Sequence, residues 1–212
     1  MDVIGYIVTM PLAYLLGSIP SGFLAAKAKG IDIRKEGSGN IGATNALRVL
    51  GKPAGITVLV VDGLKGFAAA AWLVDLMRHL FGLPPDHLEM LRLLAGLCAV
   101  LGHNYTCWLK FKGGKGIATT AGVLAALVPL TLVIISSLFL VLTFATGFVS
   151  VGSIGAAVAL PFVCWLTGSS LALVMVTGAL SILALYKHRS NIRRLMNGTE
   201  SRIGSRRKEA TS

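Results

Sequence analysis

The chain of 212 residues has few charged side chains. Charged residues make up 14% of the sequence and hydrophobic residues 54%, whereas soluble domains have about one-quarter charged residues. The stretch from 117 to 186 contains no charged residue at all. This shortage of charge excludes an ordinary soluble domain and indicates a protein that crosses a membrane.

Cysteine is also scarce, and metal-binding patterns are missing. The three cysteines, Cys98, Cys107 and Cys164, show no CxxC spacing, and an odd number in apolar or interfacial positions argues against a disulfide framework. No cluster of His, Cys, Asp and Glu has the spacing of a metal site. We therefore expect no metal and no cofactor.

Four apolar stretches approach or exceed the roughly 18 to 20 residues that cross a bilayer. They run from Val3 to Ala26, from Ala54 to Val74, from Leu91 to Leu109 and from Ile117 to Tyr186. Hydrocarbon offers no hydrogen-bond partners to the backbone, so each span is expected to be helical. The predicted fold class is an all-α polytopic helix bundle in a membrane.

Lysine and arginine are unevenly distributed along the chain. Seventeen of the twenty lie in residues 27–52, 110–116 and 187–212, and such basic segments favour the cytoplasmic side. The N-terminus is then outside and the C-terminus cytoplasmic. The uncharged stretch begins and ends beside cytoplasmic segments, so it must cross the membrane an even number of times. Added to the three spans before it, four crossings predict about seven helices and two crossings predict five.

The net charge of +11 is concentrated in these loops, so it does not predict a nucleic-acid partner. The first apolar run lacks a basic region before it, so we interpret it as a retained helix and not as a signal peptide. Residues 1–200 are expected to form one transmembrane domain. Residues 201–212 are expected to form a flexible, basic cytoplasmic tail.

The first polar segment, residues 30–51, is rich in glycine. Gly37, Gly39 and Gly42 precede an expected short helix from Ala43 to Leu50, whose N-terminal N–H groups and dipole favour an anion. A sharp turn between two helices is the simpler interpretation, but a turn needs few donors. The side chains expected to add donors or charge are Ser38, Asn40, Thr44, Asn45 and Arg48.

The second polar segment, residues 102–120, combines glycines with lysines. Gly116 stands where a Walker A loop has Ser or Thr, so a nucleoside triphosphate with Mg²⁺ is not expected. Backbone amides and lysines suit a simpler phosphate, although a positive-inside loop would also explain the lysines. The candidate binding residues are His103, Lys112, Gly113, Gly114, Lys115 and Gly116.

The third polar segment, residues 187–200, is expected to continue a helix out of the membrane. His188 and Asn191 share a face, and an imidazole beside an amide can bind or activate a hydroxyl. Within the second span, Asp62 and Lys65 lie at i and i+3, where they can form an ion pair. Because embedded charge is costly, we interpret the pair as structural and not as a proton relay.

These three segments resemble the three cytoplasmic motifs of the bacterial acyl-phosphate:glycerol-3-phosphate acyltransferases, the PlsY family. The likeness covers nearly the whole chain and is carried by residues 37–45, 111–116 and 188–200. The resemblance implies transfer of an acyl chain from acyl phosphate to the 1-hydroxyl of sn-glycerol 3-phosphate, giving lysophosphatidic acid and phosphate. One departure, Tyr105-Thr-Cys107 in place of an aromatic-Pro-Val step, is expected to alter only local helix geometry.

The resemblance also implies residue roles. Ser38, Arg48, His188 and Asn191 are expected to be catalytic, the second-motif glycines to be needed for activity, and Glu200 to clamp the C-terminus. Our hypothesis is that Ser38 and the glycine loops hold acyl phosphate, while Arg48, Lys112, His188 and Asn191 hold glycerol 3-phosphate. The base is either His188 or the departing phosphate. No GxSxG motif or Cys–His pairing suggests an acyl-enzyme.

The expected partners are the two substrates, membrane lipid and, transiently, a soluble enzyme that makes acyl phosphate. The expected location is the bacterial cytoplasmic (inner) membrane, with the active site on the cytoplasmic face. The alternative function is a membrane transporter of phosphorylated solutes, which would also need many helices and cationic groups. The lack of an internal repeat and the clustering of polar motifs at one interface disfavour it.

Overall fold

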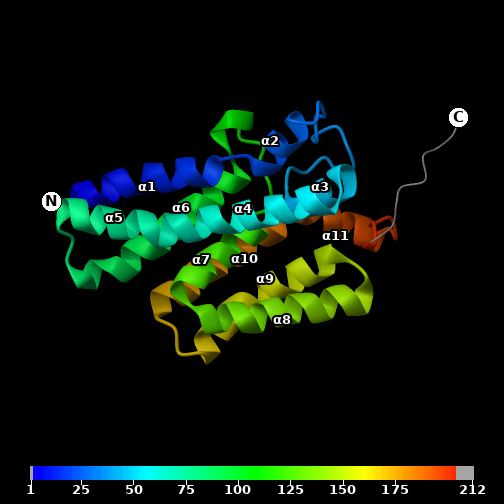
Figure 1. The fold of residues 1–212 in the computed structure, drawn as a ribbon. Helices are drawn as coiled ribbons and strands as arrows, with labels where there is room; N and C mark the ends of the chain where they lie inside the picture. Colours follow the sequence, from blue (N-terminus) through cyan, green and yellow to red (C-terminus); the bar gives the residue numbers. More distant parts are fainter. Residues whose placement is uncertain (1, 204–212) are drawn as a thin grey trace, which may run out of the picture.

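The computed structural model describes residues 2–203, and within them the chain is built of helices and connecting loops (Figure 1). The predicted all-α class is confirmed. The first helices are α1 (Asp2–Ser18), α2 (Ser21–Lys27), α3 (Ala43–Leu50), α4 (Lys52–Ala70), α5 (Trp72–Phe81) and α6 (Leu88–Asn104). The later ones are α7 (Ile117–Leu127), α8 (Pro129–Thr146), α9 (Val149–Leu166), α10 (Leu171–Lys187) and α11 (Arg189–Met196). Two 3₁₀ turns, η1 (Pro85–His87) and η2 (Cys107–Leu109), lie on either side of α6.

The prediction of seven spans is not confirmed by helix length. In the described part of the chain, four helical stretches are long and apolar enough to cross a membrane, and a bent pair, α10 with α11, would add a fifth. The four stretches are Val3–Lys27, Lys52–Phe81, Pro129–Thr146 and Val149–Leu166. Helix α7 has eleven residues, or about 16 Å at 1.5 Å per residue, which is too short to cross alone. The orientation of the termini stays a prediction.

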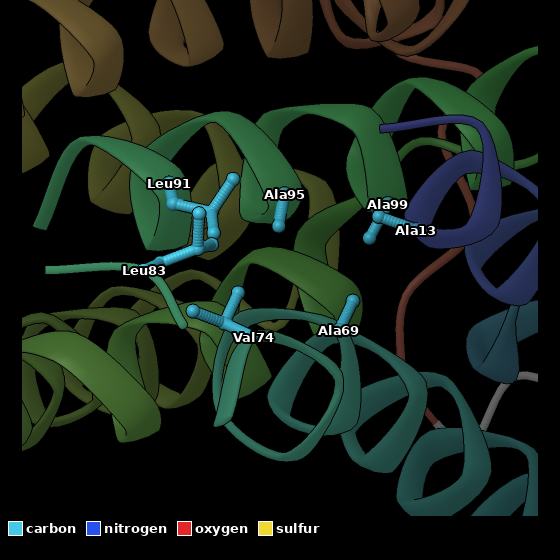
Figure 2. Packing of buried hydrophobic residues seen from close by; sticks show 7 residues of the cluster. All are labelled: Ala13, Ala69, Val74, Leu83, Leu91, Ala95 and Ala99. Atoms are coloured by element: carbon cyan, nitrogen blue, oxygen red, sulfur yellow. The ribbon is translucent and has the colours of Figure 1, made fainter. Parts of the chain in front are cut away.

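Helices α1, α4, α5 and α6 form one packed layer whose core is rich in alanine. Figure 2 shows the side chains at its centre, which are Ala13, Ala69, Val74, Leu83, Leu91, Ala95 and Ala99. A Cβ added to Gly17 of α1 would lie 2.0 Å from the carbonyl oxygen of Ala99 in α6. Small residues of this kind let membrane helices approach closely, where packing takes the place of the hydrophobic effect.

Helices α4 and α7 approach each other even more closely. A Cβ on Gly122 of α7 would lie 1.8 Å from the carbonyl oxygen of Gly63, and one on Gly66 of α4 would lie 2.1 Å from that of Thr119. This glycine contact joins the short α7 to the long α4. The N-terminus of α7, in the last part of the second polar segment, is thereby held beside α4.

Part of the predicted tail packs against the helices. The backbone N–H of Ile203 donates a 2.8 Å hydrogen bond to the carbonyl oxygen of Gly147, in the loop between α8 and α9. The guanidinium of Arg202 lies 5.2 Å from the centre of the Phe148 ring in the same loop. The rest of the tail, residues 204–212, lies outside the described residues.

Candidate functional site

The three polar segments meet in one pocket of about 770 Å³ that is open to solvent. Its lining includes Ser38, Asn40, Thr44, Asn45, Arg48, His103, Lys115, Gly116, His188, Asn191 and Glu200, all of which were singled out in the sequence. Asp62, predicted to be purely structural, also lies in its wall, as do Ser150 and Ser153 of α9. Neither serine could be identified from the sequence, because both lie in a helix without charged residues.

Asn45 organises the loop that precedes α3. Its buried Nδ2 donates to the carbonyl oxygens of Ile33, Glu36 and Asn40 at 3.3, 3.0 and 2.8 Å, and its Oδ1 accepts from the backbone N–H of Ser38 at 2.9 Å. The amide is therefore used within the protein, although the sequence suggested it as a donor to substrate. Its effect is to hold the exposed Ser38 at the rim of the pocket.

Arg48 comes from the last turn of α3, and its guanidinium lies in the pocket wall. Nη2 donates a 3.2 Å hydrogen bond to the carbonyl oxygen of Ser201, so the segment after α11 contacts the first motif directly. Partial burial lowers the pKa of Arg48, while the negative charge of Glu200 opposes that shift. An arginine stays protonated under these conditions and supplies a permanent positive charge.

The second motif uses its glycines for close packing. The backbone N–H groups of Gly113 and Gly114 donate to the carbonyl oxygens of Asn104 and His103 at 3.2 and 3.0 Å. A Cβ on Gly113 would lie 2.0 Å from the carbonyl oxygen of His103, and one on Gly114 would lie 2.0 Å from its Nε2. The phosphate nest expected from this pair is thus not free, because both amides already have acceptors in α6.

The two lysines of the second motif have different surroundings. Lys112 is exposed and lies outside the pocket lining, so the expected contact of this residue with substrate is not supported. Lys115 lies in the pocket, and its Nζ donates to Oδ1 of Asn191. Burial, together with the positive charge of Arg194, lowers the pKa of Lys115 to about 8. Lys115 is therefore the lysine of this motif that faces the pocket.

His188 lies at the bend between α10 and α11, beyond the last residue of α10. Its Nδ1 lies 2.8 Å from the carbonyl oxygen of Ala184, which places the proton on Nδ1 and leaves Nε2 as an acceptor. Burial and the charge of Lys115 lower the pKa of His188 to about 4. At neutral pH this imidazole is uncharged and can accept a hydrogen bond from a hydroxyl.

Glu200 joins the third motif to α9. Its Oε1 accepts from Ser150 Oγ at 3.0 Å and from Asn191 Nδ2 at 2.8 Å, while its Oε2 accepts from Arg194 Nε at 2.6 Å. Burial would raise the pKa of Glu200, but these three hydrogen bonds outweigh it and keep the pKa below its usual value. The resulting carboxylate orients Asn191, whose carbonyl oxygen faces Lys115.

Asp62 and Lys65 form the predicted ion pair, with Nζ 2.7 Å from Oδ1. The same carboxylate oxygen accepts from Ser21 Oγ at 2.7 Å, and Lys65 donates to the carbonyl oxygen of Ile19 at 2.8 Å. His103 Nδ1 lies 3.5 Å from Asp62 Oδ1. The cluster joins α4 to the break between α1 and α2 and to the end of α6.

A second, apolar groove of about 850 Å³ adjoins the polar pocket. Four residues line both spaces, namely Leu59, Ile117, Ala118 and Phe139. The remaining groove wall comes from α7, α8, α9 and α10 and is apolar except for Thr120, Ser136 and Ser181. A phosphorylated head and a hydrocarbon tail could therefore be bound side by side.

The pocket offers cations and neutral hydrogen-bonding groups. Among residues 2–203, no group of three or more His, Cys, Asp and Glu side chains could hold a metal ion. The fold and the two adjoining spaces define a class: a helical integral membrane protein with an anion-binding pocket that opens onto a site for a hydrocarbon chain.

Comparison with known proteins narrows this class. The family model described as glycerol-3-phosphate acyltransferase matches residues 7–198. Proteins of that name from Geotalea daltonii and Chlorobium phaeobacteroides are 47% and 43% identical, covering 89% and 93% of this chain and 93% and 96% of their own. The chain belongs to the glycerol-3-phosphate acyltransferase family.

Two solved structures of an integral membrane glycerol 3-phosphate acyltransferase, PlsY (YgiH), have the same fold. The glycerol 3-phosphate form gives a TM-score of 0.84 at 37% identity and covers 94% of this chain and 96% of that one. The lysophosphatidic acid form gives 0.81 at 36% identity, with 94% and 95% covered. The predicted family and multi-pass membrane class are thus confirmed.

Proposed function

We propose that this protein transfers an acyl chain from acyl phosphate to the 1-hydroxyl of sn-glycerol 3-phosphate, giving lysophosphatidic acid and inorganic phosphate. The observation that carries the proposal is the wall shared by the polar pocket and the apolar groove. A donor whose acyl chain fills the groove has its phosphate end at this wall. The solved relatives in glycerol 3-phosphate and lysophosphatidic acid forms support the same acceptor and product.

Arg48 and Lys115 are the cations proposed to hold the phosphate groups, since both line the pocket. Ser38 adds a hydroxyl at the rim, and Asn191 is held by Glu200 with its amide fixed. Fixed charges that act where negative charge develops lower a barrier without reorganisation. Holding the two substrates together contributes further, because it removes the entropic cost of bringing them into line.

The reaction needs no covalent intermediate with the protein. The 1-hydroxyl oxygen attacks the carbonyl carbon of the acyl phosphate and an ester bond forms. The bond between that carbon and the phosphate oxygen breaks, and the phosphate leaves with the electron pair. The proton of the hydroxyl is transferred to the departing phosphate, directly or through His188, so the products are an ester and protonated phosphate.

Of the two candidate bases, the phosphate is favoured. His188 with a pKa of about 4 holds a proton weakly, whereas a phosphate group has a second pKa of about 6. We propose that Nε2 of His188 orients the hydroxyl by accepting its hydrogen bond and that the phosphate takes the proton. His188→Gln, whose side-chain oxygen can still accept a hydrogen bond, should then retain measurable turnover.

We further propose that the pocket faces the cytoplasm of a bacterial inner membrane. The basic residues around it support this, because Lys and Arg are enriched in cytoplasmic loops. Acyl phosphate would then be delivered from the cytoplasmic side by a soluble enzyme that makes it. Such an enzyme would meet exposed basic residues of the second motif such as Lys112.

The test uses protein purified in detergent, palmitoyl phosphate, radiolabelled glycerol 3-phosphate and EDTA. Lysophosphatidic acid should form in the wild type and be strongly reduced in Ser38→Ala. If folded wild-type protein forms no product from acyl phosphate, acyl-CoA or acyl carrier protein donors, the proposal is overturned. Uptake of labelled glycerol 3-phosphate into proteoliposomes would then support the transporter alternative.

A further inference from the structure

The apolar groove exists because its walls carry small residues. Helices α7, α9 and α10 contribute Ala118, Ala121, Ala156, Ala157, Ser181 and Ala184 to the lining. Ser136 of α8 faces the same space. Side chains of this size at neighbouring helical positions leave a continuous channel that larger residues would fill.

The end of the groove away from the polar pocket is closed by large residues. Leu124, Ile135 and Leu160 line the groove and are only 3%, 7% and 3% exposed. All three also belong to a buried hydrophobic cluster that includes Leu93, Cys164 and Leu173. They therefore form a floor, with tightly packed core behind them and free space in front.

Helix geometry gives the depth of this space. On α7 the lining extends from Ile117 at the polar pocket to Leu124 at the floor, a difference of seven residues. Seven residues of helix correspond to about 10 Å. An extended chain advances about 1.3 Å per carbon, because each carbon–carbon bond of about 1.5 Å is angled to the chain axis, so that depth corresponds to roughly eight carbons.

We propose that Leu124, Ile135 and Leu160 set the depth of the acyl groove and thereby the chain length at which kcat/KM stops rising. This inference rests on the proposed acyltransferase function. Carbons beyond the floor must bend out of the groove toward the lipid. They bury no further surface against the protein, so they add little to recognition.

The test measures kcat/KM with a series of saturated acyl phosphates from two to sixteen carbons at saturating glycerol 3-phosphate. In the wild type, kcat/KM should rise by at most about fourfold, the value for transfer from water, for each added carbon that the groove buries. It should level off near eight to ten carbons. A steady rise through sixteen carbons, or no dependence on length, would overturn the inference.

Two neighbouring serines of α8 provide a matched pair of variants. Ser136 lines the groove, whereas Ser137 is exposed and is not part of the lining. Ser136→Phe should shorten the chain length at which kcat/KM levels off by about four carbons, because the phenyl ring blocks the groove about one turn below Phe139. Ser137→Phe should leave the chain length at which kcat/KM levels off unchanged. An equal shift in both variants, or no shift in Ser136→Phe, would overturn the inference.

Leu160→Ala provides the opposite change, because it opens the floor. In this variant kcat/KM should level off at a longer chain length, and the KM for glycerol 3-phosphate should be unchanged. If this variant does not fold, the serine pair alone decides. If product forms but kcat/KM does not level off at any chain length, only this inference is overturned. If no product forms at any chain length, the proposed function is overturned as well.

Discussion

Two buried carboxylates with cationic partners lie in the wall of the same pocket, and their surroundings differ. Asp62 pairs with Lys65 at 2.7 Å, and Glu200 pairs with Arg194 at 2.6 Å. In the first pair, the remaining contacts go to Ser21, to the backbone at Ile19 and to His103, which join helices. In the second, Glu200 also holds Asn191, which contacts Lys115 in the pocket.

The comparison separates two uses of buried charge. The cluster of Asp62 and Lys65 satisfies its own charges within the protein, so its main effect is expected on stability. The cluster of Glu200 and Arg194 includes an amide that faces a cation in an open pocket, so its main effect is expected on catalysis. Four experiments test this distinction.

The largest effect is expected from Asp62→Ala. Removing one partner of a buried ion pair leaves Lys65 uncompensated and should cost about 3 to 5 kcal/mol of unfolding free energy. Thermal unfolding in detergent measures the loss. The double variant Asp62→Leu/Lys65→Met should recover most of it, because apolar residues often replace a buried pair without loss. A single variant as stable as the wild type would contradict the structural role.

Lys115→Ala should reduce kcat/KM about a hundredfold at unchanged stability, the loss typical of one stabilising donor. Lys112→Ala is the matched control, since it lies three residues earlier in the same motif but outside the pocket lining. Its kcat/KM should stay within about twofold of the wild type. Equal losses in the two variants would show that net basic charge, and not position, determines activity.

Glu200→Gln should lower kcat/KM by roughly thirtyfold, or about 2 kcal/mol, since the hydrogen bond from Arg194 loses its charged acceptor. Steady-state kinetics with both substrates measures the change. Glu89→Gln provides the control, because Glu89 also accepts a hydrogen bond from a serine, Ser170, but lies outside the pocket lining. If Glu200→Gln and Glu89→Gln both keep full activity, the catalytic role expected of Glu200 is contradicted.

The smallest effect is expected from pH. Lys115 has a pKa of about 8, so it is protonated below pH 8 and loses its charge above it. Because kcat/KM reports the free enzyme, it should fall about tenfold by pH 9. Lys115→Arg should move this decline to higher pH, since arginine stays protonated. A decline at the same pH in Lys115→Arg would assign it to another group.

Local patterns were sufficient for part of this molecule. The ion pair of Asp62 and Lys65 needs only the spacing of one helix, and it forms as predicted. The helix from Ala43 to Leu50 also forms within its predicted bounds. The seven-span count depended on dividing an uncharged stretch, and the short α7 shows that apolar composition does not give helix length.

Other features depend on contacts between distant residues. The roles of Gly113 and Gly114 follow from the end of α6, whose carbonyl oxygens accept their N–H groups. Ser150 lines the pocket and contacts Glu200, which lies fifty residues later in the sequence. Lys115 and Asn191 meet across 76 residues of sequence, and no periodicity indicates which of two nearby lysines will do so.

The sequence by itself determined the membrane class and the family, because apolar runs require helices in hydrocarbon and the three polar motifs are specific. It also indicated which segments carry the site, since basic residues segregate to one membrane face. Only the tertiary structure decided which donors are already used within the protein and where the apolar groove lies. Those outcomes depend on packing between helices, and side-chain packing is a property of three-dimensional neighbours.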